Sequence, residues 1–363
     1  MKAQLHMLLN YGKHHRVWPF VDVRHNEIYV SVALLKTLVR PVCKLLRSQD
    51  YGDSWSKVAD FYTMDKRNTT TGQPFVTKEG IILIPIWSAG FYTQGTPWLV
   101  LYRSDDSGVS WEKAYEDPKG TYGKHFFQSP SGHLYIGIGF GGGGSGGKVS
   151  STPRRSYLLK SEDEGKSWRK IFHVDYPTAL YSGVALNDET ILVAAREKKS
   201  LFLSVDGGKT WKETRVGNTT RSVSYIKELR KIVVTSNSAL FISNDALEWA
   251  QLNAPIKGLI LRYPTWYKGR LYMSSVGWHC YVVSTDLNRW YLSFDVTRDT
   301  GSNLGARMAV LNDYLFVGDE ANGTLIRAKL PLDSNVSVNL RQKLKGNMNY
   351  LAFLAKYAIR RIL

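Results

Sequence analysis

The feature that most constrains this chain is a short motif that recurs along it. The copy that ends at Trp211 begins at Ser204 and has the pattern S-x-D-x-G-x-[ST]-W. Intact copies are centred on Asp50, Asp106, Asp163 and Asp206, and two shorter copies without the glycine are centred on Asp245 and Asp286. Successive copies lie about 40 to 60 residues apart, which is close to the repeat length of a β-propeller blade.

Each copy of the motif predicts a turn between two strands. Asp tolerates unusual backbone angles and bonds the backbone two residues further on, while Gly supplies a positive φ. The Trp then begins the next strand, and we expect its large ring to be buried against a neighbouring blade. The motif therefore predicts a hairpin at a fixed place in every repeat.

Short runs rich in Val, Ile, Tyr and Phe lie between the motifs and predict an all-β fold. The predicted strands of the first blade are Trp18–Val23, Glu27–Ala33, Cys43–Ser48 and Trp55–Phe61, with an insertion from Leu34 to Pro41. The second blade is predicted to use Phe75–Thr77, Ile81–Ile86, Trp98–Arg103 and the strand after Trp111. Later blades repeat this order, so the chain predicts a β-propeller of four-stranded antiparallel blades.

The last set of strands lacks a fourth member. Arg307–Leu311, Tyr314–Val317 and Thr324–Ala328 predict three strands, and the apolar N-terminal run Gln4–Leu9 is the candidate for the fourth. This pairing would join the two ends of the propeller and remove an open sheet edge. We predict seven blades within residues 1–333, with six blades plus extra strands as the alternative.

Residues 334–363 differ from the rest of the chain. Apolar residues recur there every three or four positions from Leu340 to Ile362, which predicts an amphipathic helix. The helix is basic and has no acidic residue from Leu340 onward; its cations are Arg341, Lys343, Lys345, Lys356, Arg360 and Arg361. Two interpretations stay open: the helix packs on the propeller or a partner chain, or it lies on an anionic membrane surface.

The composition favours acidic partners. The formal net charge is +17, and 43% of the residues are hydrophobic, which is enough for a substantial core. No nucleic-acid-reading motif is present. The N-terminal segment Met1–Phe20 lacks the apolar run of a secretory signal, so we expect a cytoplasmic protein or one exported by a route that the sequence does not show. If the basic helix binds lipid, we expect the protein to be peripheral on the membrane.

Neither a metal site nor a cofactor is predicted. The chain has two cysteines, Cys43 and Cys280, and they form no metal-binding motif. The run from Gly142 to Lys148 has the spacing of a P-loop, but Val149 replaces the Ser or Thr and no helix is predicted after it. We interpret this run as a loop of the third blade.

Candidate site residues come from the loops that enter each blade and from those that join its second and third strands. Clustered arginines at one mouth would grip an acidic group, and aromatic rings would stack on sugars. The candidate ligand-binding residues are Arg196, Arg221, Arg262, Tyr263, Trp278, His279 and Arg307. The candidate catalytic residues are Tyr181, Glu197 and Glu320, and Lys124 and His125 open the third blade at the same mouth.

The repeated motif resembles the Asp-box (BNR) repeat of sialidases and related propellers, over residues 48 to 290. The resemblance implies that the motif aspartates are structural, because the Asp box of that family lies on the non-catalytic side. It also implies a triad of arginines for a carboxylate, here Arg196, Arg262 and Arg307, and a Tyr–Glu nucleophile pair. The R-I-P motif of that family is absent, and the nearest string is Ile84-Pro85-Ile86.

Two classes of function therefore remain open at this stage. One is a glycoside hydrolase that acts on an acidic glycan. The other is a non-enzymatic binding or assembly propeller, such as an accessory of cell-envelope polysaccharide synthesis at the membrane surface. The oligomeric state is not predicted.

The membrane hypothesis makes a direct prediction. Full-length protein is expected to sediment with liposomes that contain anionic lipid, because the basic helix would add electrostatic attraction to apolar burial. Removal of residues 340–363 is expected to abolish this sedimentation, and neutral liposomes serve as the control. If the full-length protein stays in the supernatant with anionic liposomes, the hypothesis is wrong.

Overall fold

The computed structural model describes residues 5–12, 15–34, 42–65, 69–88, 98–120, 122–139, 156–176, 178, 180–195, 200–217, 220–236, 239–253, 260–276, 280–284, 287, 290–295, 306–319 and 323–330. The predicted C-terminal helix lies outside these residues. Within them, no helix has the length and apolar character needed to cross a membrane.

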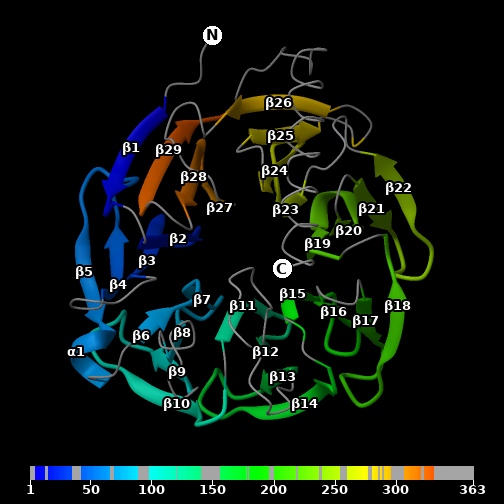
Figure 1. The fold of residues 1–363 in the computed structure, drawn as a ribbon, viewed down its shortest axis with the longest axis horizontal. Helices are drawn as coiled ribbons and strands as arrows, with labels where there is room; N and C mark the ends of the chain where they lie inside the picture. The colour runs from blue at the N-terminus through cyan, green and yellow to red at the C-terminus, as the bar shows by residue number, and fades with distance from the viewer. Residues whose placement is uncertain are drawn as a thin grey trace, which may run out of the picture.

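The described strands form seven antiparallel sheets around a central axis, and the molecule is a β-propeller (Figure 1). The first sheet has β2 (His15–Asp22), β3 (Glu27–Leu34), β4 (Cys43–Ser48) and β5 (Ser56–Asp60). The second has β6 (Thr69–Thr71), β7 (Phe75–Val76), β8 (Ile82–Ser88), β9 (Leu99–Ser104) and β10 (Glu112–Asp117). The short helix α1 (Phe61–Asp65) joins the two sheets.

The remaining sheets repeat the same order. The third has β11 (Tyr122–Gln128), β12 (Leu134–Gly139), β13 (Ser156–Ser161) and β14 (Arg169–Val174), and the fourth has β15 (Leu180–Ala185), β16 (Ile191–Ala195), β17 (Ser200–Ser204) and β18 (Lys212–Arg215). The fifth has β19 (Ser222–Ile226), β20 (Lys231–Thr235), β21 (Ala239–Ser243) and β22 (Ala250–Asn253), and the sixth has β23 (Ile260–Tyr267), β24 (Arg270–Val276), β25 (Cys280–Ser284) and β26 (Trp290–Asp295). The seventh has β27 (Ala306–Leu311), β28 (Tyr314–Asp319), β29 (Thr324–Lys329) and β1 (Leu5–Asn10).

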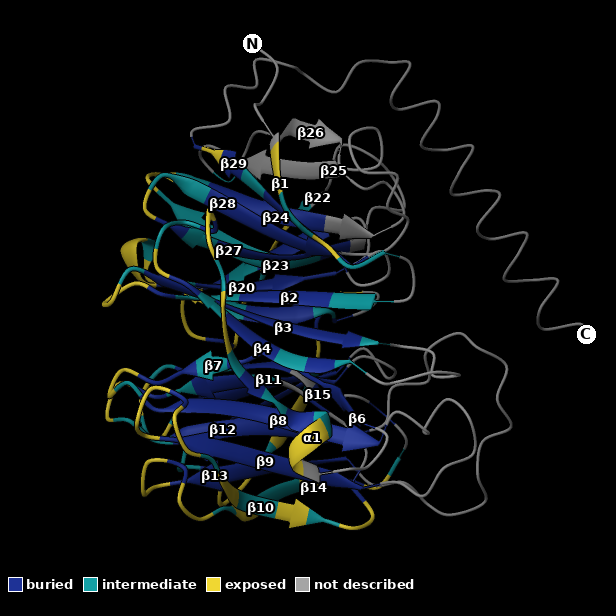
Figure 2. Cartoon of the chain, turned by 90° about the vertical axis from the view of Figure 1, so that its left-hand side faces the viewer, coloured by how far each residue is buried: buried dark blue, intermediate teal, exposed yellow. Residues whose placement is uncertain are grey.

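The first strand of each sheet lies innermost and the last lies on the outside (Figure 1). The middle strands are covered on both faces by neighbouring sheets, so β8, β9 and β12 are buried along their whole length (Figure 2). Such strands consist of near-continuous apolar runs, whereas the outer strands β10 and β18 are mostly charged and are exposed or half-buried. The core therefore lies between successive sheets, in layers that repeat around the axis.

The N-terminal strand completes the last sheet. β1 pairs antiparallel with β29, from Leu5 opposite Ala328 to Asn10 opposite Thr324. The predicted use of the N-terminal run as the missing fourth strand is thereby confirmed. Because β1 precedes the first sheet in the chain, this pairing connects the two ends of the propeller through backbone hydrogen bonds.

The repeated motifs form turns between the third and fourth strands. In the copy before β18, Ser204 Oγ donates to Asp206 Oδ1 at 2.8 Å and accepts from Gly208 N at 2.8 Å. Asp206 also accepts from the backbone N of Thr210 at 2.9 Å. Gly208 has a φ of 93°, which explains the glycine in the motif. The side chain and backbone of Thr210 are the main reason that the pKa of Asp206 falls to about 2.

The other turns repeat these contacts around Asp50, Asp106 and Asp163. In the shorter copy of the fifth sheet, Ala246 takes the place of the glycine and still has a φ of 66°. The motif aspartates described by the structure therefore use their carboxylates to close the turns. Asp286 lies outside the described residues.

The motif tryptophans pack on the preceding sheet. The Trp211 ring lies 4.6 Å from the ring of Phe172 on β14, and the Trp111 ring lies 5.1 Å from that of Phe61 in α1. Trp211 Nε1 also donates to the carbonyl of Gly208 at 3.0 Å. Both tryptophan rings are only half-buried, so the expectation of buried rings was too strong: the rings cover the outer ends of the sheet interfaces.

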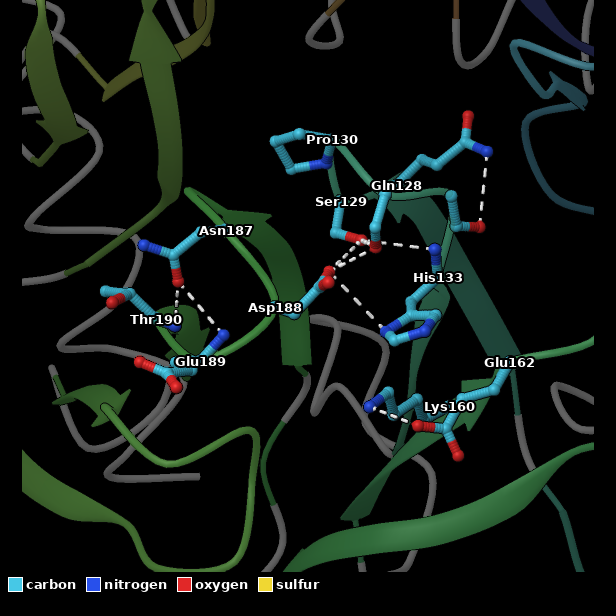
Figure 3. Close-up of polar contacts among 12 residues, drawn as sticks. Gln128, Ser129, Pro130, His133, Lys160, Glu162, Asn187, Asp188, Glu189 and Thr190 are labelled. Carbon is cyan, nitrogen blue, oxygen red and sulfur yellow. Dashed lines mark hydrogen bonds and ion pairs between the residues drawn. The ribbon is translucent and has the colours of Figure 1, made fainter.

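Hairpins between the first and second strands are linked from sheet to sheet at one end of the propeller. Three neighbouring pairs of sheets are joined by hydrogen bonds at this end: Lys268 to Asp313, Asn312 to Asn26, and Lys78 to Gln128. Figure 3 shows the next link, where Asp188 of the fourth sheet accepts from Ser129 of the third at 2.8 Å and lies 3.5 Å from His133 Nδ1. These contacts hold neighbouring sheets in register at the same end as the motif turns.

The half-buried position of Trp211 sets the size of its contribution to stability. Trp211→Ala is expected to lower the free energy of unfolding by about 2 kcal/mol, less than the ~3–5 kcal/mol of a fully buried ring. Val205→Ala in the same turn is the control, because Val205 is 64% exposed. The free energy of unfolding of both variants is measured by urea denaturation, with circular dichroism as the signal. Equal losses in the two variants would show that the Trp211 ring has no special role.

Candidate functional site

A cavity of about 110 Å³ lies among the innermost strands of the propeller. It is lined by Gln73, His125, Ser182, Ser222, Ser224, Tyr263, Pro264, Thr265, Arg307 and Met308. These residues come from the starts and middles of β11, β15, β19, β23 and β27 and from the segment between β6 and β7. The cavity therefore lies on the central axis, where side chains from several sheets converge.

Irregular pairing of the innermost strands marks the positions that face this cavity. β11 shifts register between Gly123 and Phe126, so that Lys124 and His125 form a bulge opposite β12. β23 shifts between Arg262 and Thr265. Bulges change the direction of a side chain without breaking the sheet and are common beside functional sites.

The bulge in β23 gives one of its residues, Tyr263, an unusual backbone conformation. Tyr263 has a φ of 52°, which is costly for a bulky residue and is held only where the surroundings enforce it. The following Pro264 removes a backbone donor from the same stretch. β15 has a similar register shift between Leu180 and Ser182, at Tyr181.

Arg307 of β27 is the charged residue of the cavity wall. Its side chain is only 1% exposed, and its guanidinium carbon lies 4.5 Å from the centre of the Trp18 ring and 4.6 Å from that of Tyr263. Arg307 also donates to Gln73 Oε1 at 2.6 Å. Contacts with aromatic faces stabilise a guanidinium where water is excluded. Arg16 lies against the same Trp18 ring, at 4.4 Å.

His125 is a neutral group beside this cation. Its Nδ1 is buried and has no hydrogen-bond partner among the described residues, although the residue as a whole is of intermediate exposure. Burial, and then the charge of Arg307, lower the pKa of His125 to about 3. The imidazole is therefore uncharged at neutral pH and offers one donor and one acceptor.

Serine hydroxyls line the opposite wall. Ser182 Oγ on β15 donates to the carbonyl of Val223 at 2.9 Å and accepts from its backbone N at 3.2 Å, which ties β15 to β19. Ser222 Oγ lies 2.6 Å from Thr235 Oγ1. Together with Ser224, these groups give the cavity a polar surface that suits hydroxylated or anionic ligands.

The structure brings together Tyr263 and Arg307 of the predicted site residues, and His125, which was predicted at the same mouth, joins them in the cavity wall. Arg221 precedes β19 and Arg262 lies in β23; both are half-buried, and neither lines the cavity. The backbone of Tyr181 lies in β15, but its side chain is outside the described part. The other candidates, Arg196, Glu197, Trp278, His279 and Glu320, also lie outside it.

Sequence reasoning missed Trp18, Gln73 and the three serines. Trp18 was assigned to a strand and Gln73 to no element, and neither has a neighbour in sequence that signals a site. The useful signal for Gln73 is its place between Gly72 and Pro74, two residues that interrupt a strand. Within the described part of the chain, no group of three or more His, Cys, Asp or Glu side chains could hold a metal ion.

These features define the molecule as a repeat β-propeller with a polar, cationic cavity on its axis. Residues 13–240 match the family model of the BNR repeat-like domain, and the chain belongs to that family.

Similar proteins include enzymes named for glycans. The chain is 27% identical over 200 residues to a xyloglucanase of Acetivibrio thermocellus, which covers 46% of this chain and 22% of the relative. It is 28% identical over 196 residues to a xyloglucanase of Paenibacillus sp, which covers 46% of this chain and 18% of that one. The chain thus spans about a fifth of the length of the curated relatives that it matches.

Solved structures share the fold. YCF48 from Cyanidioschyzon merolae has a TM-score of 0.55 at 12% identity, covering 90% of this chain and 99% of that one. Virginiamycin B lyase from Staphylococcus aureus has a TM-score of 0.60 at 8% identity, covering 91% and 100%. A Hadza microbial sialidase has a TM-score of 0.53 at 16% identity, covering 89% and 68%. All three structures are under 25% identical to this chain, so the similarity to them shows the β-propeller fold alone.

The environment of His125 leads to a prediction for the pKa of its imidazole. The pKa of His125 is expected near 3 in the native protein, and Arg307→Met is expected to raise it because one of its two causes is removed. The value should stay below the ordinary 6.5 or so, since burial, the larger cause, remains. NMR titration of the imidazole protons measures the shift. Arg169→Met on the outer strand β14 is the control, and a native pKa near 6.5 would contradict the geometry.

Proposed function

We propose that this propeller recognises an acidic glycan through its axial cavity. The observation that carries the proposal is the environment of Arg307, a buried guanidinium held against two aromatic rings at the wall of a polar cavity. A guanidinium binds carboxylate or sulfate through paired hydrogen bonds. The glycan-named relatives support the choice of a glycan as ligand.

The size of the cavity restricts what enters it. At about 110 Å³ it is much smaller than the roughly 300–1,000 Å³ of most ligand pockets. The cavity therefore suits an acidic substituent, such as a carboxylate or sulfate group, with the rest of the glycan outside. His125 and the serines would bond the oxygens of that group or of a neighbouring hydroxyl.

The sequence adds a long-range electrostatic argument. The second strands of the described sheets end where the innermost strands begin, and in the sequence these ends are followed directly by the segments that lead to the third strands. Their basic residues are Lys36, Arg40, Lys148, Arg154, Arg155, Arg196, Lys198 and Lys199, and their acidic residues are Glu197 and Glu320. A surplus of positive charge at one end of a channel steers anionic ligands towards it.

Recognition without hydrolysis is favoured by the cavity itself, because the described lining residues include no carboxylate. Hydrolysis is the second candidate function. It rests on Glu197 and Glu320, which follow β16 and β28 in the sequence, and on the xyloglucanase relatives. Release of sugar that is lost in Glu197→Gln or Glu320→Gln would favour the hydrolase.

Binding and turnover are measured on one panel of neutral, sialylated, uronic and sulfated glycans. Arg307→Met is expected to weaken binding of an acidic glycan about tenfold to a hundredfold, because a charge-assisted pair of hydrogen bonds is lost. Arg307→Lys should give an intermediate affinity, since it keeps the charge without the planar fork. Isothermal titration calorimetry measures the affinities, and melting temperatures verify folding.

Arg169→Met serves as the matched control, because Arg169 lies on β14 with 59% of its side chain exposed. Its affinity should equal that of the native protein. If no acidic glycan binds, or if Arg307→Met binds acidic glycans as tightly as the control does, the proposed function is wrong.

A further inference from the structure

Gln73 links Arg307, on the last sheet of the propeller, to the first sheet. Its Oε1 accepts from Arg307 at 2.6 Å, and its Nε2 donates to the carbonyl of Pro19 at 2.7 Å. Arg307 can only donate and a carbonyl can only accept, so the orientation of the amide is fixed. The side chain thus joins β27 of the seventh sheet to β2 of the first.

The backbone around Gln73 is itself firmly held. Gly72 N donates to the carbonyl of Pro85 on β8 at 2.9 Å, and the carbonyl of Gly72 accepts from Ser31 Oγ on β3 at 2.8 Å. A Cβ on Gly72 would lie 2.7 Å from the carbonyl oxygen of Gly123, so only glycine allows this close approach to the third sheet. The interruption between β6 and β7 therefore aims one side chain, Gln73, at the cavity.

We infer that Gln73 is the positioning residue that presents the Arg307 guanidinium to an acidic ligand and sets the charge selectivity of the cavity. This inference rests on the proposed function and adds the residue that determines specificity. A neutral amide at this position holds the guanidinium through one of its nitrogens without cancelling its charge. A carboxylate of the same shape would hold it equally well but would form an ion pair.

The inference is tested by Gln73→Glu and Gln73→Met. In Gln73→Glu the new carboxylate neutralises Arg307, repels an acidic ligand and has no donor for its second oxygen beside Pro19. The affinity for an acidic glycan should fall about a hundredfold, and the affinity for a neutral glycan should not change. Gln73→Met removes both hydrogen bonds without adding charge, so a fall of about tenfold is expected.

The probes are trigalacturonate, a chondroitin sulfate tetrasaccharide and the neutral trisaccharide galactotriose, titrated by calorimetry at two salt concentrations. Affinity of the native protein for the acidic probes should fall with salt, and Gln73→Glu should flatten this dependence, which a purely structural role would not do. Gln251→Glu is the matched control, because it adds the same charge on the outer strand β22.

The possible outcomes distinguish the role of Gln73 from the proposed function. If the native protein binds an acidic probe and Gln73→Glu binds it equally tightly, the role of Gln73 is refuted while the proposed function stands. If Gln73→Glu does not fold, Gln73→Met decides: unchanged selectivity between acidic and neutral probes refutes the inference. If the native protein binds neither acidic probe, both the proposed function and the inference are refuted.

Discussion

The structure depends on the pairing of β1 with β29. Every sheet of this propeller buries both faces against its neighbours, so an open ring would expose two apolar sheet faces and an unpaired edge. The β1 strand removes that edge with a ladder from Leu5–Ala328 to Asn10–Thr324. The contacts between β2 and β27 then bring the first and seventh sheets together on the axis.

The cavity is a direct consequence of this closure. Arg307 belongs to the seventh sheet, Trp18 to the first, Gln73 to the second and Tyr263 to the sixth. These side chains meet across the point where the ends of the chain are joined. Any opening of the ring would separate Arg307 from Trp18 and Gln73, so the proposed binding site and the global fold share one set of contacts.

The amount that the sequence could predict differs between the fold and the site. The predicted strand Cys43–Ser48 coincides with β4, and the predicted Glu27–Ala33 and Thr324–Ala328 end one residue before β3 and β29 do. Apolar runs between turn residues are a local signal, so such strands can be predicted from the sequence. The short β6 was missed, since Thr69–Thr71 has no apolar pattern and is recognised only by its pairing with β8.

The site could be predicted only in part, for a physical reason. Arg307 and Tyr263 were candidates because they lie in or beside loops that enter the blades. Gln73 was not, because its contact with Arg307 joins residues 234 positions apart and depends on closure of the ring. The bulges at His125 and Tyr263 are likewise set by the pairing of whole strands, so a local pattern of residues does not predict them.

The presence of Arg307 on the axis is itself an argument for a ligand. Burial of a guanidinium costs free energy, and replacement of buried charged groups by apolar side chains of similar volume is often neutral or stabilising. A channel that needed only to be filled would be filled more stably by Leu or Met. The contacts with Trp18, Tyr263 and Gln73 offset part of the cost and keep the charge at the cavity wall beside a neutral imidazole. Under the proposed function, recognition of an anionic group makes a charge at this position useful.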